Sequence, residues 1–389
     1  MPTEATSIAK PQRDAVAHVR DSARDKALSV RDRLLMSPRF QRWAARFPLT
    51  RPIARRQARQ AFDLCAGFVY SQTLFAAIRL GLLDAVTPTS LALSELIARS
   101  GLPPDRAALL IDAAIGLDLL SRRSGDRIGL GMIGAAIAAN PSIAAMVEHH
   151  DRLYADLSDP VALLGSARGD TKLSRFWPYS GAKLPKEVDP EAVAGYSALM
   201  TSSQQMLSAD ILDAYPFDRH RRVLDLGGGE GAFATEVVRR HATINACIFD
   251  LPAVAQRARD RIADAGLSNR IETCGGDFFD DALPGGFDAV TLVRIVHDHD
   301  DDRVLQLFRN IRRSLTEGGT LVIAEPMSDT LDATRVTDIY FAFYLLAMGS
   351  GRPRSPASLR RLLEQAGFTR FRTYPTARPM LVSILTAKV

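Results

Sequence analysis

The sequence predicts an α/β protein in which a Rossmann-like, doubly wound sheet follows a helical, winged-helix-like domain. From Arg222 onward, short apolar segments alternate with helical ones, which is the pattern of such a sheet. Within that half, VLDLGGGEGAFATEV (residues 223–237) has the pattern of a buried strand, a glycine turn and the start of a helix. Between residues 61 and 150, three strongly helical segments precede a short segment that suits a strand pair.

The chain of 389 residues is longer than one average domain, so we expect several parts. Its 47% of hydrophobic and 24% of charged residues are ordinary for a globular protein. The expected parts are a basic, partly ordered N-terminal segment (1–60), the winged-helix-like domain (61–150), a helical linker (151–220) and the α/β domain (221–389).

The positive charge of the chain is concentrated at its start. Residues 1–60 hold 14 Lys and Arg against 5 Asp and Glu, a net charge of +9, which leaves −4 for residues 61–389. The stretch KALSVRDRLLMSPRFQRWAARF predicts a helix there. Its apolar side would be formed by Leu34, Leu35, Phe40, Trp43 and Phe47. Such a segment suits nucleic acid, an anionic membrane surface, or a solvated leader without a partner.

No uncharged apolar run approaches the roughly 18 residues of a membrane-spanning helix, so we expect none. The N-terminus lacks the apolar core of a secretory signal. The three cysteines, Cys65, Cys247 and Cys274, have no metal or disulfide spacing. These features favour a cytoplasmic protein.

A winged helix raises the alternative of a DNA-binding regulator. The segment in the recognition position, Asp105 to Arg123, carries Asp112 and Asp118 among Ala, Leu and Ile. Few of these side chains suit DNA, so we expect no nucleic-acid partner. An apolar helix there suits contact with another subunit or a cover over the active site.

The glycine turn admits two ligands. Gly227, Gly229 and Ala232 satisfy the G-x-G-x-x-G/A pattern, and Asp250 follows at the end of the next strand, which is the fingerprint of an NAD-dependent dehydrogenase. Asp225, however, places a carboxylate before the turn. It would repel a pyrophosphate and attract a cationic amino-acid group.

An acidic side chain ends each of three successive predicted strands: Asp225, Asp250 and Asp277. Asp250 is placed to accept hydrogen bonds from both hydroxyls of a ribose. Asp277 is placed to bind the exocyclic amine of adenine, with Phe278 on the ring. A nucleoside held through sugar and base, with no phosphate clamp, is S-adenosylmethionine. The alternative is that these aspartates only cap the following helices.

Four motifs together resemble one family: VLDLGGGEGAF, FDLPAVAQRA, GGDFFDDALPGGFDAVTLVRIVHDHDDD and GGTLVIAEPM. They are similar to class I, S-adenosylmethionine-dependent small-molecule O-methyltransferases, which include the plant caffeic-acid enzymes and bacterial relatives. The resemblance implies a homodimer formed through residues 61–150, an acceptor pocket that involves residues 151–220, S-adenosylhomocysteine as product, and no metal. It also implies cofactor contacts from Asp225, Gly227, Gly229, Asp250, Leu251, Asp277, Phe278 and Arg294.

Methyl transfer to a hydroxyl needs a base, and the stretch RIVHDHDDD offers two histidines. If the strand continues, His297 and His299 point in opposite directions. The resemblance assigns the base to His297 and its orientation to Glu325. A second family glutamate is expected near residue 358, where this chain has Ser358.

The acidic run Asp298, Asp300, Asp301 and Asp302 suits either a divalent metal or the N-terminus of a helix. We favour helix capping, because DDDRVLQLFRNIRRSL begins a helix there.

The stretch FPLTRPIARRQARQAFDLCAGFVYSQTLF (residues 47–75) resembles a narrower branch, the carotenoid O-methyltransferases of photosynthetic bacteria. The resemblance implies a lipophilic acceptor, the tertiary hydroxyl of an acyclic carotenoid such as hydroxyneurosporene or demethylspheroidene, with Met200 and Met348 beside it. Phenolic and polyketide acceptors remain the alternative. A carotenoid acceptor implies peripheral contact with the inner membrane.

Overall fold

The computed structural model describes residues 24–165, 170–176, 204 and 207–389. The chain divides into two compact units, Met1–Ala76 and Ala77–Val389, which are described separately. Met200, one of the two methionines assigned to the acceptor, lies outside the described residues.

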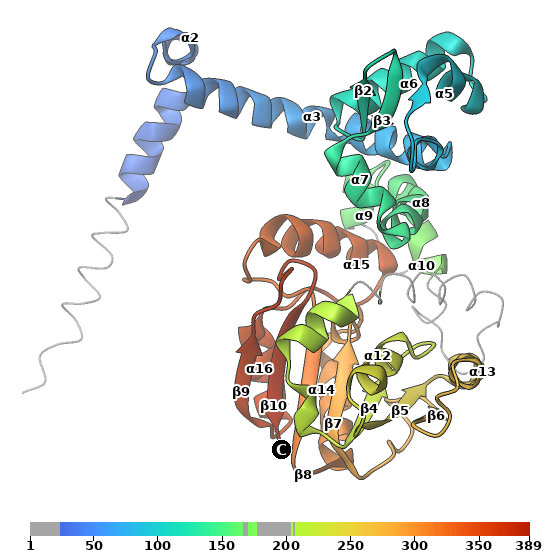
Figure 1. The fold of residues 1–389 in the computed structure, drawn as a ribbon. Helices are drawn as coiled ribbons and strands as arrows, with labels where there is room; N and C mark the ends of the chain where they lie inside the picture. Colours follow the sequence, from blue (N-terminus) through green and yellow to red (C-terminus); the bar gives the residue numbers. More distant parts are fainter. Residues whose placement is uncertain (1–23, 166–169, 177–203, 205–206) are drawn as a thin grey trace, which may run out of the picture. The chain divides into compact units, whose positions relative to one another are not determined.

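The described part of the first unit is helical (Figure 1). A helix over residues 24–36 is followed by α2 (Pro38–Arg46) and the long α3 (Arg51–Arg79), whose last residues belong to the second unit. The sequence predicted one helix where the first two lie. They are separate because Pro38 disfavours helical geometry at Ser37, whose hydroxyl instead accepts a hydrogen bond from Phe40 N.

The exposure of α3 is unusual for an apolar helix. Among the described helices it is the one that is long and apolar enough to cross a membrane, a test that helices of soluble proteins also pass. Only 6% of its apolar window is buried. This helix qualifies the expectation of no spanning segment, because its apolar stretch includes a single charged residue, Asp63.

The second unit begins with the expected winged-helix arrangement. Its elements are α4 (Leu82–Ala85), β1 (Leu91–Ala92), α5 (Leu93–Arg99), α6 (Pro104–Gly116), β2 (Leu120–Arg123), β3 (Arg127–Leu130) and α7 (Met132–Ala138). The three strands form a sheet in the order β1-β3-β2. The helix expected over residues 105–123 is too long, because it ends at Gly116. Asp118 then adopts a φ of 56°, which turns the chain into β2.

Three helices follow: α8 (Pro141–Asp156), α9 (Pro160–Gly165) and α10 (Lys172–Phe176). They pack with a later helical segment, the π-helix η4 (Thr334–Phe341) and α15 (Ala342–Met348). Their shared buried cluster contains Leu153, Leu163, Leu173, Tyr344, Leu345, Ala347 and Met348. Met348 is therefore a core residue of this helical layer.

The rest of the unit is a seven-stranded sheet in the order β6-β5-β4-β7-β8-β10-β9. Five strands are parallel, and β10 runs antiparallel to both of its neighbours. The strands are β4 (Arg222–Leu226), β5 (Asn245–Asp250), β6 (Ile271–Gly275), β7 (Phe287–Val293), β8 (Leu315–Glu325), β9 (Thr369–Tyr374) and β10 (Ser383–Lys388). The doubly wound sheet is confirmed. The sequence analysis missed β9.

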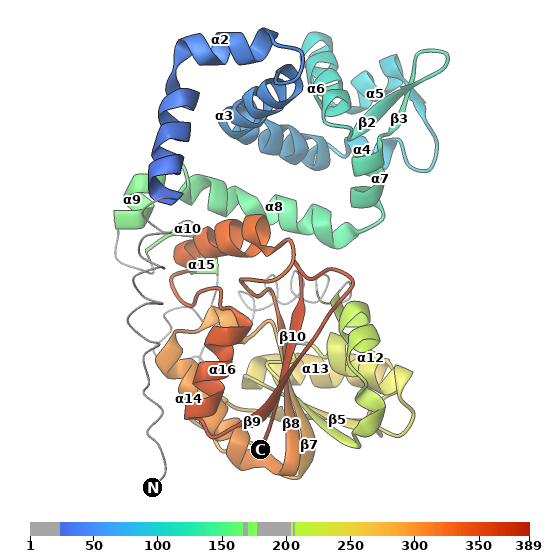
Figure 2. The same cartoon turned by 90° about the vertical axis from the view of Figure 1, so that its left-hand side faces the viewer.

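Helices cover both faces of this sheet (Figures 1 and 2). They are α12 (Ala232–Arg240), α13 (Pro252–Asp264), α14 (Asp301–Ser314) and α16 (Pro356–Gln365), and the short η2 (Phe217–Arg219) precedes β4. Leu224 and Val290 pack in the hydrophobic cluster that contains the apolar side chains of α14 and α16. The residues next to them in the strands, Val223 and Ala289, pack in a second hydrophobic cluster, with α12. Neighbouring strand residues thus face opposite layers, as a doubly covered sheet requires.

Candidate active site

The carboxyl ends of the five parallel strands meet at one edge of the sheet. Asp225 lies near the end of β4, Asp250 ends β5 and Glu325 ends β8. Asp277 and Arg294 come soon after β6 and β7. The residues that the sequence analysis selected are therefore gathered at the edge where doubly wound enzymes bind ligands.

The glycine turn lies between β4 and α12. Gly227, Gly229 and Gly231 have φ angles of 67°, 57° and 83°, a region that other residues rarely adopt. A side chain at Gly228 would lie 2.6 Å from Asp225 Oδ2, so the turn passes directly over that carboxylate. At Gly229 a Cβ would meet no atom within 4 Å, which leaves this part of the turn open to a ligand.

Asp225 is almost fully buried and only partly satisfied. Thr291 Oγ1 donates a hydrogen bond of 2.6 Å to its Oδ1, whereas Oδ2 has no hydrogen-bond partner. Burial raises the pKa of Asp225 to about 7. A cationic group at Oδ2 would satisfy that oxygen and favour the ionised carboxylate.

Asp250 joins the glycine turn to the next helix. Its Oδ2 accepts a hydrogen bond of 2.8 Å from Gly229 N, and its Oδ1 accepts one of 2.7 Å from Leu251 N. Burial raises its pKa to about 6. A carboxylate has about four acceptor sites, so both oxygens retain capacity for the hydroxyls of a ribose. Leu251 lies at the N-cap of α13, next to this carboxylate.

Asp277 and Phe278 form the third part of this edge. Asp277 Oδ1 accepts a hydrogen bond of 2.8 Å from Phe279 N, so the carboxylate also fixes its own turn. Phe278 approaches the glycine turn, because a Cβ at Gly227 would lie 3.7 Å from its ring. The ring is thus placed beside the turn, as contact with a bound base would require.

Glu230, within the glycine turn, has a role that the sequence analysis missed. Its buried carboxylate accepts hydrogen bonds from Arg257 Nε at 2.8 Å and from Arg261 Nη1 at 2.6 Å. Burial opposes its ionisation, but these two guanidinium groups together lower its pKa. The pair of arginines ties the turn to α13.

The strand that precedes His297 is shorter than expected. β7 ends at Val293, and Arg294, with a φ of 59°, turns the chain into the 3₁₀ helix η3 (Val296–Asp298). His297 therefore lies on a turn, and strand alternation does not separate it from His299. Arg294 N is bonded to Ala324 O at 2.9 Å, which fixes this turn against the end of β8.

His297 is buried between two carboxylates. Its backbone N donates a hydrogen bond of 3.1 Å to Glu325 Oε2, and its ring Nδ1 lies 3.5 Å from the same oxygen. Its Nε2 lies 3.1 Å from Asp298 Oδ1. Burial alone would lower the pKa of His297, but Asp298 and then Glu325 raise it to about 9. Its Nδ1 makes no hydrogen bond within the described part of the chain, and the two carboxylates favour the protonated form of the imidazole.

The second carboxylate beside His297 is that of Asp298, and the position near residue 358, where a glutamate was expected, holds Ser358. Ser358 lies on α16, where its N donates a hydrogen bond to Ser355 Oγ and its hydroxyl contacts Arg361. The adjacency of Asp298 and His297 in the sequence was a signal for this pairing, but the acidic run was assigned to helix capping.

Two further members of the acidic run, Asp300 and Asp301, bind the segment 350–354. Asp300 is at the N-cap of α14, yet its Oδ1 accepts a hydrogen bond from Gly351 N at 3.2 Å and caps no helical N–H. Asp301 binds Arg352 and Arg354. The expected helix start is confirmed, because Asp300 is the N-cap and Asp301 and Asp302 lie in the first turn of α14, although the Asp300 side chain makes no cap hydrogen bond. In the described part of the chain, no three His, Cys, Asp or Glu side chains are grouped to hold a metal ion.

His299 faces the aromatic residues that come after β6. Its ring centroid lies 4.9 Å from that of Phe279 and 5.8 Å from that of Phe278, at nearly perpendicular angles. Burial lowers its pKa to about 4, so it is neutral near pH 7. It lies on the side of Phe278, the residue assigned to the cofactor base.

The buried, unsatisfied oxygen of Asp225, the open turn at Gly229 and the free acceptor capacity of Asp250 suit a ligand with a cationic group and a ribose. A pyrophosphate would meet the buried carboxylate of Asp225, which disfavours it. The doubly wound sheet and this edge define a nucleoside-binding transferase of the class I methyltransferase type.

Comparison with known families agrees. Residues 154–369 match the model of the O-methyltransferase domain, and residues 62–132 match that of the O-methyltransferase dimerisation domain. The chain belongs to the O-methyltransferase family, and it is an S-adenosylmethionine-dependent enzyme.

Two similar curated relatives are demethylspheroidene O-methyltransferases. That of Cereibacter sphaeroides is 43% identical over 361 residues, which cover 91% of this chain and 93% of the relative. That of Rhodobacter capsulatus is 39% identical over 358 residues, 92% and 88% of the two chains. The crystal structure of human N-acetylserotonin methyltransferase in complex with S-adenosylmethionine has a TM-score of 0.71, at 23% identity, over 85% of this chain and 97% of that one. At this level of identity, the similarity to the human enzyme is evidence for the fold alone.

Proposed function

We propose that this enzyme methylates the tertiary hydroxyl of an acyclic hydroxycarotenoid, with His297 as the general base. The observation that carries the proposal is the buried His297, which lies just after β7 with the carboxylates of Asp298 and Glu325 beside it. The acceptor is inferred from the relatives named demethylspheroidene O-methyltransferase, which match this chain over more than 90% of its length.

S-adenosylmethionine supplies the methyl group. Asp225, the glycine turn, Asp250, Asp277 and Phe278 would hold this cofactor, through its cationic, ribose and base parts in turn. Asp250 also keeps Gly229 and Leu251 in place through its backbone hydrogen bonds.

His297 removes the proton of the acceptor hydroxyl. Its Nδ1 lies 3.5 Å from Glu325 Oε2, so Nε2 would receive the proton once the acceptor hydroxyl takes the place of Asp298. A tertiary alcohol is hardly ionised near neutral pH, so its proton must leave in step with methyl transfer. Because the pKa of His297 is raised to about 9, the neutral form that can accept this proton becomes dominant only at higher pH.

The direct test of the acceptor is a comparison of pigments from cells with and without the protein. Mass spectrometry should show the gain of one methyl group on the hydroxycarotenoid. In vitro, purified enzyme should methylate hydroxyneurosporene or demethylspheroidene. Activity confined to soluble phenols or polyketides would overturn the carotenoid assignment and leave the O-methyltransferase activity unaffected.

We also propose a homodimer formed through the dimerisation domain. Within residues 62–132 several large apolar side chains are exposed: Phe62 (65%), Leu64 (83%), Phe68 (71%), Leu109 (64%) and Met132 (81%). Large apolar side chains are unfavourable in water, and a second copy that covered them would bury them in an interface. Light scattering should give about twice the monomer mass of 42.5 kDa.

The dimer has a matched test. Leu64→Asp should produce monomers, whereas Val161→Asp, at a 77% exposed site outside the dimerisation domain, should not. A wild-type monomer with full activity at micromolar concentration would contradict the proposal.

A further inference from the structure

A stretch of the first unit, residues 33–62, carries many arginines and no acidic residue. Between Arg33 and Phe62 the sequence contains no Asp or Glu. It contains eight arginines: Arg33, Arg39, Arg42, Arg46, Arg51, Arg55, Arg56 and Arg59. All eight are exposed, and none forms an ion pair with any carboxylate that the structure describes. Within the described part of the chain, no carboxylate neutralises their positive charge.

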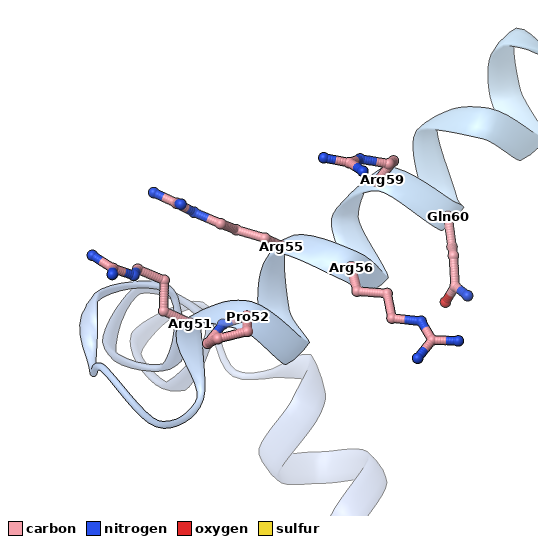
Figure 3. A pocket seen from close by; sticks show the side chains of 6 residues that line it. All are labelled: Arg51, Pro52, Arg55, Arg56, Arg59 and Gln60. Carbon is pink, nitrogen blue, oxygen red and sulfur yellow. The ribbon is translucent and has the colours of Figure 1, made fainter.

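The arginines line two neighbouring hollows along the chain. On α2, Arg39, Arg42 and Arg46 surround a hollow with Trp43 and Phe47. On α3 a second hollow is lined by Arg51, Pro52, Arg55, Arg56, Arg59 and Gln60. Figure 3 shows the side chains of Arg51, Arg55 and Arg59 extending from one side of α3, as their spacing of four residues requires.

Large apolar side chains are exposed among these arginines. Trp43 is 50% exposed and stacks on Phe47 at a centroid distance of 5.0 Å. Leu49 is 78% exposed and Ile53 60%. A segment with tryptophan, aliphatic side chains and arginines together is typical of helices that lie in a membrane interface.

We propose that residues 38–60, namely α2 and the first part of α3, bind the surface of a membrane rich in anionic phospholipids. The guanidinium groups would pair with lipid phosphates, which they match in geometry. Trp43, Leu49 and Ile53 would enter the boundary between headgroups and acyl chains. Membrane binding would bring the enzyme to its acceptor, because a hydroxycarotenoid is dissolved in the membrane. In this respect the inference rests on the proposed function.

Two other occupants fit this segment less well. A second copy of the chain would bring the same arginines and no acidic residue from this region, so like charges would oppose each other. A nucleic acid would satisfy the charge but would leave the aliphatic side chains of Leu49 and Ile53 in water. An anionic lipid surface satisfies both the charge and the apolar side chains.

The test is sedimentation of the full-length protein with vesicles. Wild type should bind vesicles of phosphatidylcholine mixed with phosphatidylglycerol, should bind phosphatidylcholine alone weakly, and should be released by high salt. The triple variant Arg39→Gln, Arg42→Gln, Arg46→Gln should lose on the order of 100-fold in partitioning onto the anionic vesicles, since each cation contributes roughly fivefold. Trp43→Ala should weaken binding to both kinds of vesicle.

The charge-matched control is Arg219→Gln, Arg309→Gln, Arg370→Gln, at three exposed sites outside this segment. It should bind anionic vesicles like wild type. Equal losses in the two triple variants, or tighter binding of duplex DNA than of anionic vesicles at the same salt, would overturn the proposal. Turnover of detergent-dissolved hydroxycarotenoid, which needs no membrane, tests the proposed function separately and should be unchanged in the α2 variant.

Discussion

Arg354 pairs with Asp301 through Nε at 2.9 Å and Nη2 at 2.6 Å, and the side chain of Arg354 is fully buried. The same guanidinium donates to Val296 O at 2.9 Å and to His299 O at 2.6 Å. It therefore holds the backbone immediately before and two residues after His297. Arg352 N adds a hydrogen bond of 2.9 Å to His297 O. Arg352 and Arg354, which are distant from His297 in the sequence, therefore fix the position of the loop that carries the proposed base.

The first prediction concerns Arg354. Arg354→Lys keeps the positive charge but cannot reach both carbonyls and the carboxylate at once. We expect kcat to fall by about 10-fold or more, with cofactor affinity nearly unchanged and a loss of roughly 3 kcal/mol in the free energy of unfolding. Kinetics, calorimetry of cofactor binding and denaturant titration measure the three quantities.

Arg352→Lys is the control, because Arg352 also pairs with Asp301 but is 53% exposed. Exposed pairs are worth about 0.2–1 kcal/mol, so this variant should be close to wild type. If Arg354→Lys loses stability but keeps kcat, Arg354 is a structural residue without influence on His297.

The second prediction is a pH dependence. His297 must be neutral to accept a proton, and its pKa in the free protein is raised to about 9. The profile of kcat/KM should therefore rise with pH, be half-maximal near pH 9 and level off about one pH unit higher. When the acceptor hydroxyl replaces Asp298 at Nε2, one carboxylate contact is lost, so the pKa seen in kcat should be lower.

Asp298→Asn tests the cause of this shift. Removing the carboxylate that most raises the pKa of His297 should move the rise of kcat/KM to lower pH, toward the ordinary histidine value of about 6.5. A profile with the wild-type midpoint in this variant would show that the titrating group is another residue.

Sequence alone predicted the part of the site that depends on strand order. Asp225, Asp250 and Glu325 lie at one edge because parallel strands align their carboxyl ends, and each residue is near the end of an apolar segment. The loops after the strands are less regular and therefore harder to predict. The positive φ of Arg294 ended β7 early, so the argument from strand alternation for His297 and His299 had no basis.

Contacts distant in sequence were the other limit. Arg354 meets the loop of His297 across more than 50 residues, and GRPRSPASLRR carries several arginines with no pattern that distinguishes one. The strand β9 was missed because TRFRTY is largely exposed at the sheet edge and lacks an apolar face. Both features become visible only with the tertiary structure.

The third prediction concerns the cofactor. Asp250→Ala removes an acceptor that fixes Gly229 and Leu251 and that we assign to the ribose. The affinity for S-adenosylmethionine should fall by about 1.5–3 kcal/mol, the range for hydrogen bonds to a charged group.

S-adenosylmethionine should raise the Tm of wild type, whereas NADH should not. Asp260→Ala, an exposed site on α13, should bind like wild type. A Tm shift with NADH alone would favour the dehydrogenase alternative.

The fourth prediction separates the two histidines. General-base catalysis is worth about 10²–10⁴-fold, so His297→Ala should lower kcat on a hydroxycarotenoid by about that factor and leave cofactor affinity nearly unchanged. His299→Ala removes a ring that packs on Phe278 and Phe279. It should therefore weaken cofactor binding a few-fold, on the order of 1 kcal/mol for a lost aromatic contact, with a much smaller effect on kcat. Steady-state kinetics and calorimetry on both variants, with thermal melts to confirm folding, distinguish these outcomes. Wild-type kcat in a folded His297→Ala variant would remove His297 as the base.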